Sequence, residues 1–119
     1  MAGYFLAGSK IADTNALGGC YESPNDPKSL GKFEYAPEGI LLRAFPGESA
    51  IFADGYEGMR VVLVNGGPKR QAIRASDSRI SIVQQAVDAE GNWTAIECLP
   101  SSFCGNSYHD VFLGPREYW

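Results

Sequence analysis

Short strand-like runs recur along most of this 119-residue chain, and turn-forming residues separate them. The runs are rich in β-branched and aromatic residues, whereas glycine, proline, asparagine and aspartate gather between them. This spacing, with little helical periodicity, is typical of antiparallel sandwiches and partly open barrels. The sequence therefore predicts an all-β fold, an antiparallel β-sandwich of about seven short strands. The candidate runs are 32–35, 40–45, 49–52, 60–64, 71–73, 80–87, 93–98 and 109–113.

The first third of the chain lacks this pattern. Turn formers cluster at 23–27, where each proline removes a backbone donor. Residues 9–17 fit either a short helix, capped by Ser9 and stopped by the glycine that follows, or a loop. A helix there would make the fold α+β. We expect residues 1–31 to be an irregular segment packed on a sandwich of residues 32–119, in a single domain, because this length suits one core.

Several runs also predict where strands end and which strands pair. Pro46 and Gly47 should end the run 40–45. The run 60–64 is almost wholly apolar without alternation, which indicates burial on both faces near the middle of a sheet. We expect 71–73 to pair back on it.

The strongest local signal is the junction at 88–92, just before the run 93–98. Its sequence suits a short hairpin loop in which Gly91 or Asn92 takes a positive φ. We expect the closed hairpin to pack Trp93 onto the sandwich core.

Composition and charge exclude two classes of partner. The formal net charge is −4, and the densest basic stretch, residues 69–79, contains Asp77 and no aromatic residue on which a base could stack. Nucleic acid is therefore not expected as a partner. No apolar run approaches the roughly 20 residues of a membrane span, so a membrane is not expected either.

The apolar patch at 4–7 is too short for a signal peptide, and no basic segment precedes it. We therefore expect a soluble chain that is either cytoplasmic or a mature secreted fragment.

The three cysteines leave the redox state open. Cys98 and Cys104 lie close together in the sequence, and a bridge between them would add roughly 2 kcal/mol by restricting the unfolded chain. Such a bridge suits an oxidising compartment. Cys20 would then remain unpaired, which instead favours reduced, buried cysteines.

Residue types suited to catalysis crowd between Cys98 and Asp110. Cys104 as nucleophile and His109 as base would make a thiol-dependent hydrolase, which is the alternative function. Neighbouring strand residues point to opposite faces, so Asp110 is badly placed to orient His109. Cys98, Cys104 and His109 also fall short of the four ligands of a structural zinc site, so no metal is expected. The chain has no glycine motif that cradles phosphate, and no cofactor is expected.

Aromatic residues support a binding function. Tyr108, Tyr118 and Trp119 carry flat rings that suit a protein or carbohydrate surface. We therefore expect a non-enzymatic β-sandwich module that binds a protein or a carbohydrate through these residues. Tyr118 and Trp119 also look like the opening of another strand, so the chain is either a fragment or ends in a short docked strand. A cut strand would leave an open sheet edge for pairing with a second copy, giving a homo-oligomer.

The stretch Leu99–His109, with Val111–Leu113, Tyr118 and Trp119 after it, resembles a segment of uncharacterised bacterial proteins of immunoglobulin-like sandwich type. The resemblance covers about the last quarter of the chain and implies an immunoglobulin-like β-sandwich. It implies no activity, and no functional residue is transferred from it. Those sequences continue past the aromatic pair, which favours a fragment.

Overall fold

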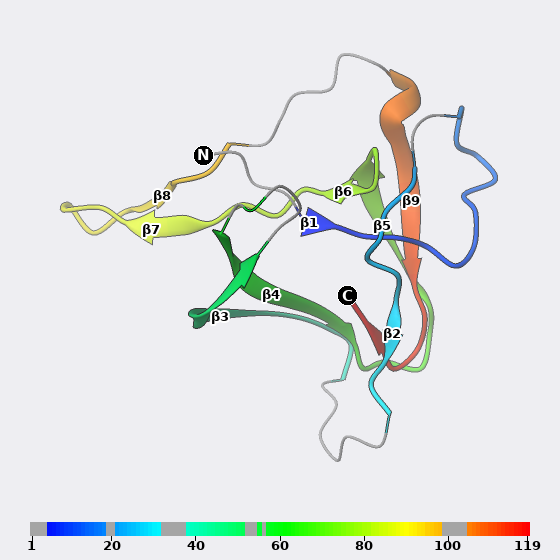
Figure 1. Ribbon diagram of the computed structural model, residues 1–119, viewed down its shortest axis with the longest axis horizontal. Coiled ribbons are helices and arrows are strands. Elements are labelled where there is room, and N and C mark those ends of the chain that lie inside the picture. The colour runs from blue at the N-terminus through cyan, green and yellow to red at the C-terminus, as the bar shows by residue number, and fades with distance from the viewer. Residues whose placement is uncertain (1–4, 19–20, 32–37, 52–54, 56, 99–104) are drawn as a thin grey trace. The chain divides into compact units, whose positions relative to one another are not determined.

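The computed structural model describes residues 5–18, 21–31, 38–51, 55, 57–98 and 105–119 (Figure 1). Its regular structure consists of β-strands in antiparallel sheets and a 3₁₀ turn, η2 (Gly105–Ser107), without an α-helix in these ranges. This confirms the all-β class and the antiparallel pairing. The expected strand at 32–35 lies outside the described residues. Within the described ranges, no helix is long and apolar enough to cross a membrane.

Contacts divide the chain into two compact units, and each unit contains two stretches of sequence. The first unit comprises Met1–Asp26 and Ala72–Phe112, and the second comprises Pro27–Gln71 and Leu113–Trp119. The single domain with residues 1–31 packed on residues 32–119 stays a prediction.

The sheet of the first unit has the strand order β1-β6-β5-β9. Its strands are β1 (Phe5–Leu6), β5 (Gln71–Ser76), β6 (Arg79–Ile80) and β9 (Tyr108–Leu113). Asp77 and Ser78 join β5 to β6 with φ values of 45° and 61°, as a type I′ hairpin turn requires. This turn folds β5 onto β6, so the expected pairing of 71–73 with 60–64 is wrong. Among the described residues of this unit, the buried apolar side chains are Ala7, Ala75, Ile80 and Val111.

The stretch 9–17 is a loop, so of the two alternatives the helix does not form. Asp13 turns the chain here, because its Oδ1 accepts the Asn15 N–H at 2.9 Å and its carbonyl oxygen accepts the Ala16 N–H at 3.2 Å. Aspartate often closes such a turn with its own side chain, which competes with a helix.

The predicted hairpin at 88–92 is confirmed. It joins β7 (Gln85–Val87) to β8 (Trp93–Ala95), and Gly91 has a φ of 87°. Asp88 Oδ1 accepts the backbone N–H groups of Glu90 and Asn92, at 3.0 and 2.8 Å, and so closes the loop. The expected single strand 80–87 is wrong, because the Ile82 N–H donates to the Ile80 carbonyl in a tight turn.

Trp93 is 70% exposed, so the expectation that it packs in the core is wrong. The hairpin forms a two-stranded sheet of its own among the described strands, and the cross-strand neighbour of Trp93 is Val87, which is also exposed. A two-stranded sheet has no third strand or opposing sheet to cover the indole ring.

Replacing Trp93 by alanine is therefore expected to change the free energy of unfolding by less than about 1 kcal/mol, the scale of one cross-strand pair. Chemical denaturation followed by far-ultraviolet circular dichroism measures the change. A loss above about 3 kcal/mol, as for a buried tryptophan, would contradict the exposed position.

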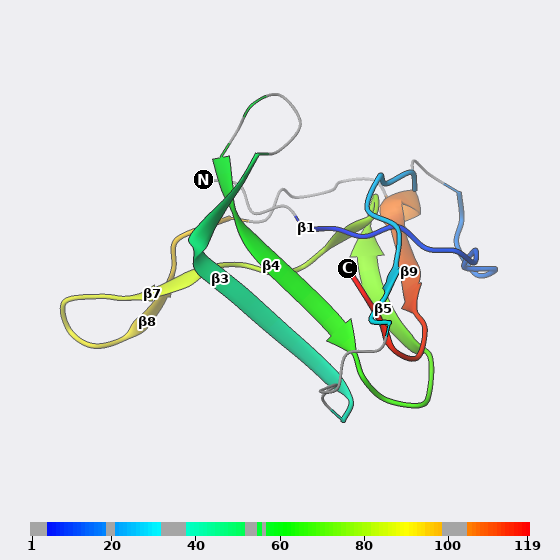
Figure 2. The ribbon, with the colours of Figure 1, turned by 60° about the horizontal axis from the view of Figure 1, so that its bottom comes forward.

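The sheet of the second unit has the strand order β2-β10-β4-β3. Its strands are β2 (Lys28–Ser29), β3 (Ile40–Ile51), β4 (Glu57–Asn65) and β10 (Glu117–Tyr118). Figure 2 shows the long strands β3 and β4 side by side. The central position of β4 is confirmed. Among its described residues, exposure below a tenth is confined to Leu63, Val64 and Asn65 at its end, so the expected burial of the whole run 60–64 is wrong at Arg60, which is exposed.

Pro46 does not end β3, contrary to the expectation. The register against β4 shifts between Phe45 and Ser49, so an irregularity absorbs the residues between them. An edge strand can accommodate a proline at a bulge, because the missing N–H leaves no ladder bond unmade there.

Candidate functional site

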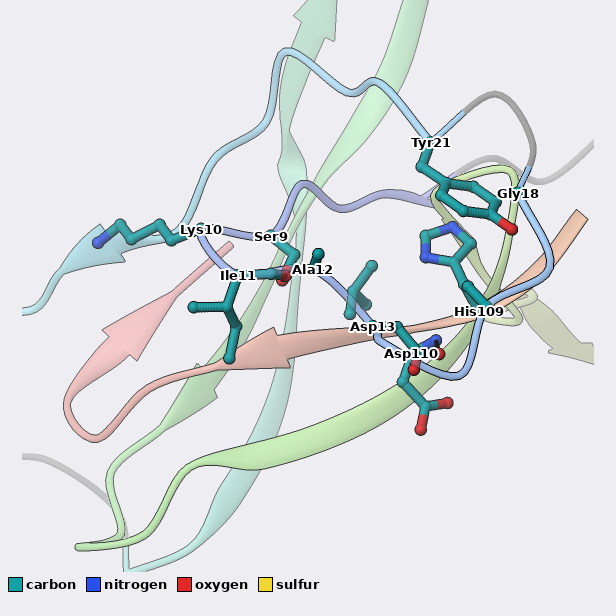
Figure 3. Close-up of a pocket in the computed structure, with 11 residues that line it drawn as sticks. Ser9, Lys10, Ile11, Ala12, Asp13, Gly18, Tyr21, His109 and Asp110 are labelled. Carbon is teal, nitrogen blue, oxygen red and sulfur yellow. Dashed lines mark hydrogen bonds between the residues drawn. The ribbon is translucent and has the colours of Figure 1, made fainter.

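A pocket of about 350 Å³ lies in the first unit, beside β9 (Figure 3). Residues 9–13, Ala16, Gly18, Tyr21 and 109–111 line it. The loop before Tyr21 therefore forms one wall, and the strand β9 forms the other. The volume falls at the lower end of the roughly 300–1,000 Å³ typical of small-ligand sites.

Two side chains of the loop hold it to β9. Asp13 Oδ2 accepts the backbone N–H of Asp110 at 2.8 Å, and Ser9 Oγ accepts the backbone N–H of Phe112 at 3.2 Å. Among the described strands β9 has only β5 as a neighbour, so these bonds lie on its outer edge. The loop is thus anchored to backbone donors of alternate β9 residues.

His109 is the buried polar group of the pocket, at 4% exposure. Its Nε2 accepts the backbone N–H of Ser78 at 2.9 Å, and its ring lies 3.9 Å from the Tyr21 ring, centroid to centroid, with 30° between the planes. The Tyr21 hydroxyl donates to the Asn106 carbonyl at 2.7 Å, and the Ser78 hydroxyl donates to the Tyr21 carbonyl at 2.5 Å. These contacts fix both rings.

The Ser78 bond assigns the tautomer of His109. A neutral imidazole has one donor and one acceptor nitrogen, so with Nε2 accepting, the proton is on Nδ1. Neither nitrogen can then take a proton from a thiol in this arrangement. Cys104, the expected nucleophile, lies outside the described residues.

Asp13 is held as a carboxylate. The N–H groups of Asp110 and then Asn15 hydrogen-bond to it and lower its pKa below the ordinary 3.8. Partial burial opposes this effect, and the nearby Arg74 guanidinium lowers the pKa further. The pocket therefore presents an ionised acceptor at neutral pH.

Asp110 has a different partner from His109. Its Oδ1 lies 3.3 Å from Arg74 Nη1, in an ion pair open to solvent, while His109 faces Ser78 and Tyr21. This agrees with the expectation that Asp110 cannot orient His109, because the two residues alternate across the strand.

The three predicted binding residues divide between the two units. Tyr108, in the first unit, is 44% exposed, and the Arg74 guanidinium lies 5.8 Å from its ring centroid. Tyr118 is half-buried in β10, with Lys28 Nζ 5.8 Å from its ring. Trp119 is only 3% exposed, and its backbone bonds to Leu63 in both directions, at 3.0 and 3.1 Å. A buried ring offers no contact surface, so Trp119 is a core residue of the second unit.

The cysteine expectations are largely untested. Cys98 is exposed, so the expectation of buried cysteines is wrong at this residue. Cys20 and Cys104 lie outside the described residues, so the redox state stays open. Among the residues that the structure does describe, no three His, Cys, Asp or Glu side chains gather as metal ligands.

Sequence reasoning did not single out Asp13, Tyr21 or Ser78 as site residues. The Asp-Thr-Asn pattern at 13–15 suits a side-chain-closed turn and could have marked Asp13 locally. No local signal links Tyr21 or Ser78 to His109.

Comparisons of the chain with protein-family models, with curated proteins and with solved structures found no match.

Proposed function

We propose that this chain is a non-enzymatic β module that binds a small polyhydroxylated ligand, a saccharide, in the pocket beside β9. The observation that supports it best is that Asp13, Asp110, His109 and Tyr21 line one space of about 350 Å³. Of the two ligand classes expected from the sequence, protein and carbohydrate, a concave site of this size favours the carbohydrate.

The polar groups of the pocket match the hydroxyl groups of a sugar. Each carboxylate has lone pairs beyond those used by its present partners, so Asp13 and Asp110 can accept further hydroxyl protons. His109 supplies a donor, the N–H on Nδ1. Ile11 and Val111 add apolar lining for the C–H faces of a sugar ring.

The thiol-dependent hydrolase with Cys104 and His109 has less support. It needs an imidazole nitrogen that accepts a proton, and the Ser78 N–H occupies Nε2. An immunoglobulin-like β-sandwich stays part of the proposal on the resemblance alone.

The test is a titration of ¹⁵N-labelled protein with glucose, galactose, mannose and N-acetylglucosamine, observed by NMR. We expect at least one sugar to shift the amide signals of residues 9–13 and 109–111. Asp110→Asn keeps the size of the side chain but removes its charge, so we expect it to weaken binding about tenfold or more, as for a charge-assisted hydrogen bond.

Glu90→Gln is the matched control, because it removes the same charge from an exposed hairpin loop outside the pocket lining. It should leave the affinity unchanged. If none of the four sugars shifts the pocket amides at about 50 mM, well above the Kd of even a weak ligand, the saccharide proposal is wrong.

A further inference from the structure

We propose that Asn92 is an acceptor site for N-linked glycosylation, presented by the hairpin of β7 and β8 in the folded protein. The modification transfers an oligosaccharide from a lipid diphosphate to the side-chain nitrogen of Asn92. This inference goes beyond the proposed function and does not depend on it, because Asn92 and its neighbours are not part of the pocket lining.

Residues 90–94 carry the sequence pattern of a glycan acceptor. Asn92, Trp93 and Thr94 match Asn-X-Thr, in which X is any residue except proline, and no other asparagine of the chain stands in such a sequence. Glu90 adds an acidic residue two positions before the asparagine, which bacterial oligosaccharyltransferases require in addition. The match is therefore to a longer and more selective pattern than the three-residue sequence alone.

The hairpin leaves the whole pattern open to solvent. Each of residues 90–94 is exposed, and the Trp93 side chain in its middle is 70% exposed. The Asn92 side-chain amide and the Thr94 hydroxyl both donate to the Asp88 carboxylate, so these two side chains point to the same side of the hairpin. This agrees with the alternation of side chains along a strand. An enzyme that recognises the amide and the hydroxyl together therefore meets both on one side.

The pairing that holds the pattern in place is weak. β7 and β8 share three cross-strand pairs and form a sheet of their own among the described strands. A two-stranded sheet is at best marginally stable by itself in water. The bond from Thr94 Oγ1 to Asp88 Oδ2, at 3.4 Å, is long for a hydroxyl donor. Local opening of the hairpin can therefore deliver residues 90–94 to an enzyme in extended form.

The transfer needs only the carboxamide of Asn92 from this chain. Its nitrogen attacks the anomeric carbon of the sugar that is linked to the lipid diphosphate. A bond forms between this nitrogen and that carbon, and the bond from the carbon to the diphosphate oxygen breaks. The diphosphate leaves with the electron pair, and one amide proton passes to a base of the transferase. The hydrogen bond from the amide to Asp88 has to break before this attack.

The test incubates the folded protein with a purified bacterial oligosaccharyltransferase and a lipid-linked oligosaccharide. Trypsin cleavage after Arg79 and Arg116 releases one peptide that contains Asn92, and mass spectrometry measures the added mass and its position. We expect one glycan, on Asn92. Thr94→Ala and Glu90→Gln should each abolish the modification. Thr94→Ser is the matched control, because it keeps the hydroxyl, and it should still be modified.

Asp88→Ala tests the opening of the hairpin while the acceptor pattern stays intact. We expect the wild type to react about tenfold more slowly than a synthetic peptide of residues 86–97, because the peptide has no hairpin to open. Asp88→Ala removes the acceptor of the Glu90 and Asn92 N–H groups, so its rate should approach that of the peptide. Glu48→Ala removes an exposed carboxylate from the second unit and should react like the wild type.

Two results would overturn the proposal. If the peptide is modified and the folded wild type is not, the hairpin hides the pattern from the enzyme. If the peptide is not modified either, residues 90–94 are not an acceptor sequence.

Discussion

Replacing Asn65 by leucine is expected to lower the free energy of unfolding of the second unit by about 3–5 kcal/mol, because several buried polar groups lose their partner together. Asn65 is 0% exposed at the end of β4. Its Nδ2 donates to the carbonyl oxygens of Lys69, Leu113 and Gly114, at 2.9, 3.0 and 3.0 Å, and its Oδ1 accepts the Gly67 N–H at 3.1 Å.

Leucine has the same branched shape as asparagine, so the substitution mainly tests hydrogen bonding and not the filling of space. Each backbone group left without a partner in a buried position costs about 1–3 kcal/mol, although some of these groups will reach water after small shifts. Asn65→Asp is a harsher change, since a carboxylate would face three carbonyl oxygens with no proton to give them.

Urea denaturation of the wild type and the leucine variant, followed by circular dichroism, measures the difference. Asn15→Ala is the control, because Asn15 is exposed and its one described bond uses the backbone N–H, so we expect a change within about 0.5 kcal/mol. A leucine variant within about 1 kcal/mol of the wild type would show that Asn65 does not hold the second unit together.

Asn65 also marks what the sequence could and could not predict about the fold. It directly follows the run 60–64, whose apolar residues predict a strand near the middle of a sheet. Its role depends on Leu113 and Gly114, which lie 48 and 49 positions further along the chain. No local pattern encodes a partner at that separation.

Local chemistry explains the predictions that succeeded. The turn between β7 and β8 closes through Asp88 and Gly91, which are near neighbours in sequence, and its residue types alone indicate the loop. Trp93 follows the same turn, yet its burial depends on which other strands cover the hairpin. That choice is a property of the whole fold, so the expectation of a core position failed.

The same contrast between local signals and contacts of distant residues holds for the candidate site. The sequence identified His109 and Asp110 as reactive types and predicted that they would face different ways, from strand alternation alone. It could not predict that His109 accepts a bond from Ser78, 31 positions earlier, or that Tyr21 lies against its ring. Those contacts decide whether the imidazole is a base or a structural acceptor.

Replacing His109 by alanine is expected to cost about 3–4 kcal/mol of stability, through a cavity beneath Tyr21 and an unsatisfied N–H at Ser78. His109→Phe separates the two contributions. Phenylalanine keeps a ring against Tyr21 but cannot accept a hydrogen bond, so we expect it to lose about 1–3 kcal/mol, the cost of the Ser78 N–H alone. Tyr108→Ala, at an exposed neighbouring position, should cost less than about 1 kcal/mol.

The imidazole ¹⁵N chemical shifts of the wild type show which ring nitrogen of His109 carries the proton, and this decides whether His109 can act as a base. We expect the neutral ring to carry its proton on Nδ1, because the Ser78 N–H at 2.9 Å needs Nε2 as its acceptor. If His109→Phe is as stable as the wild type and the shifts place the proton on Nε2, the Ser78 bond is absent in solution. Nδ1 would then be the acceptor, and His109 would become available as a base for the thiol-dependent alternative. The expected tautomer instead makes His109 a fixed wall of the pocket, which offers a donor to a ligand and takes no part in chemistry.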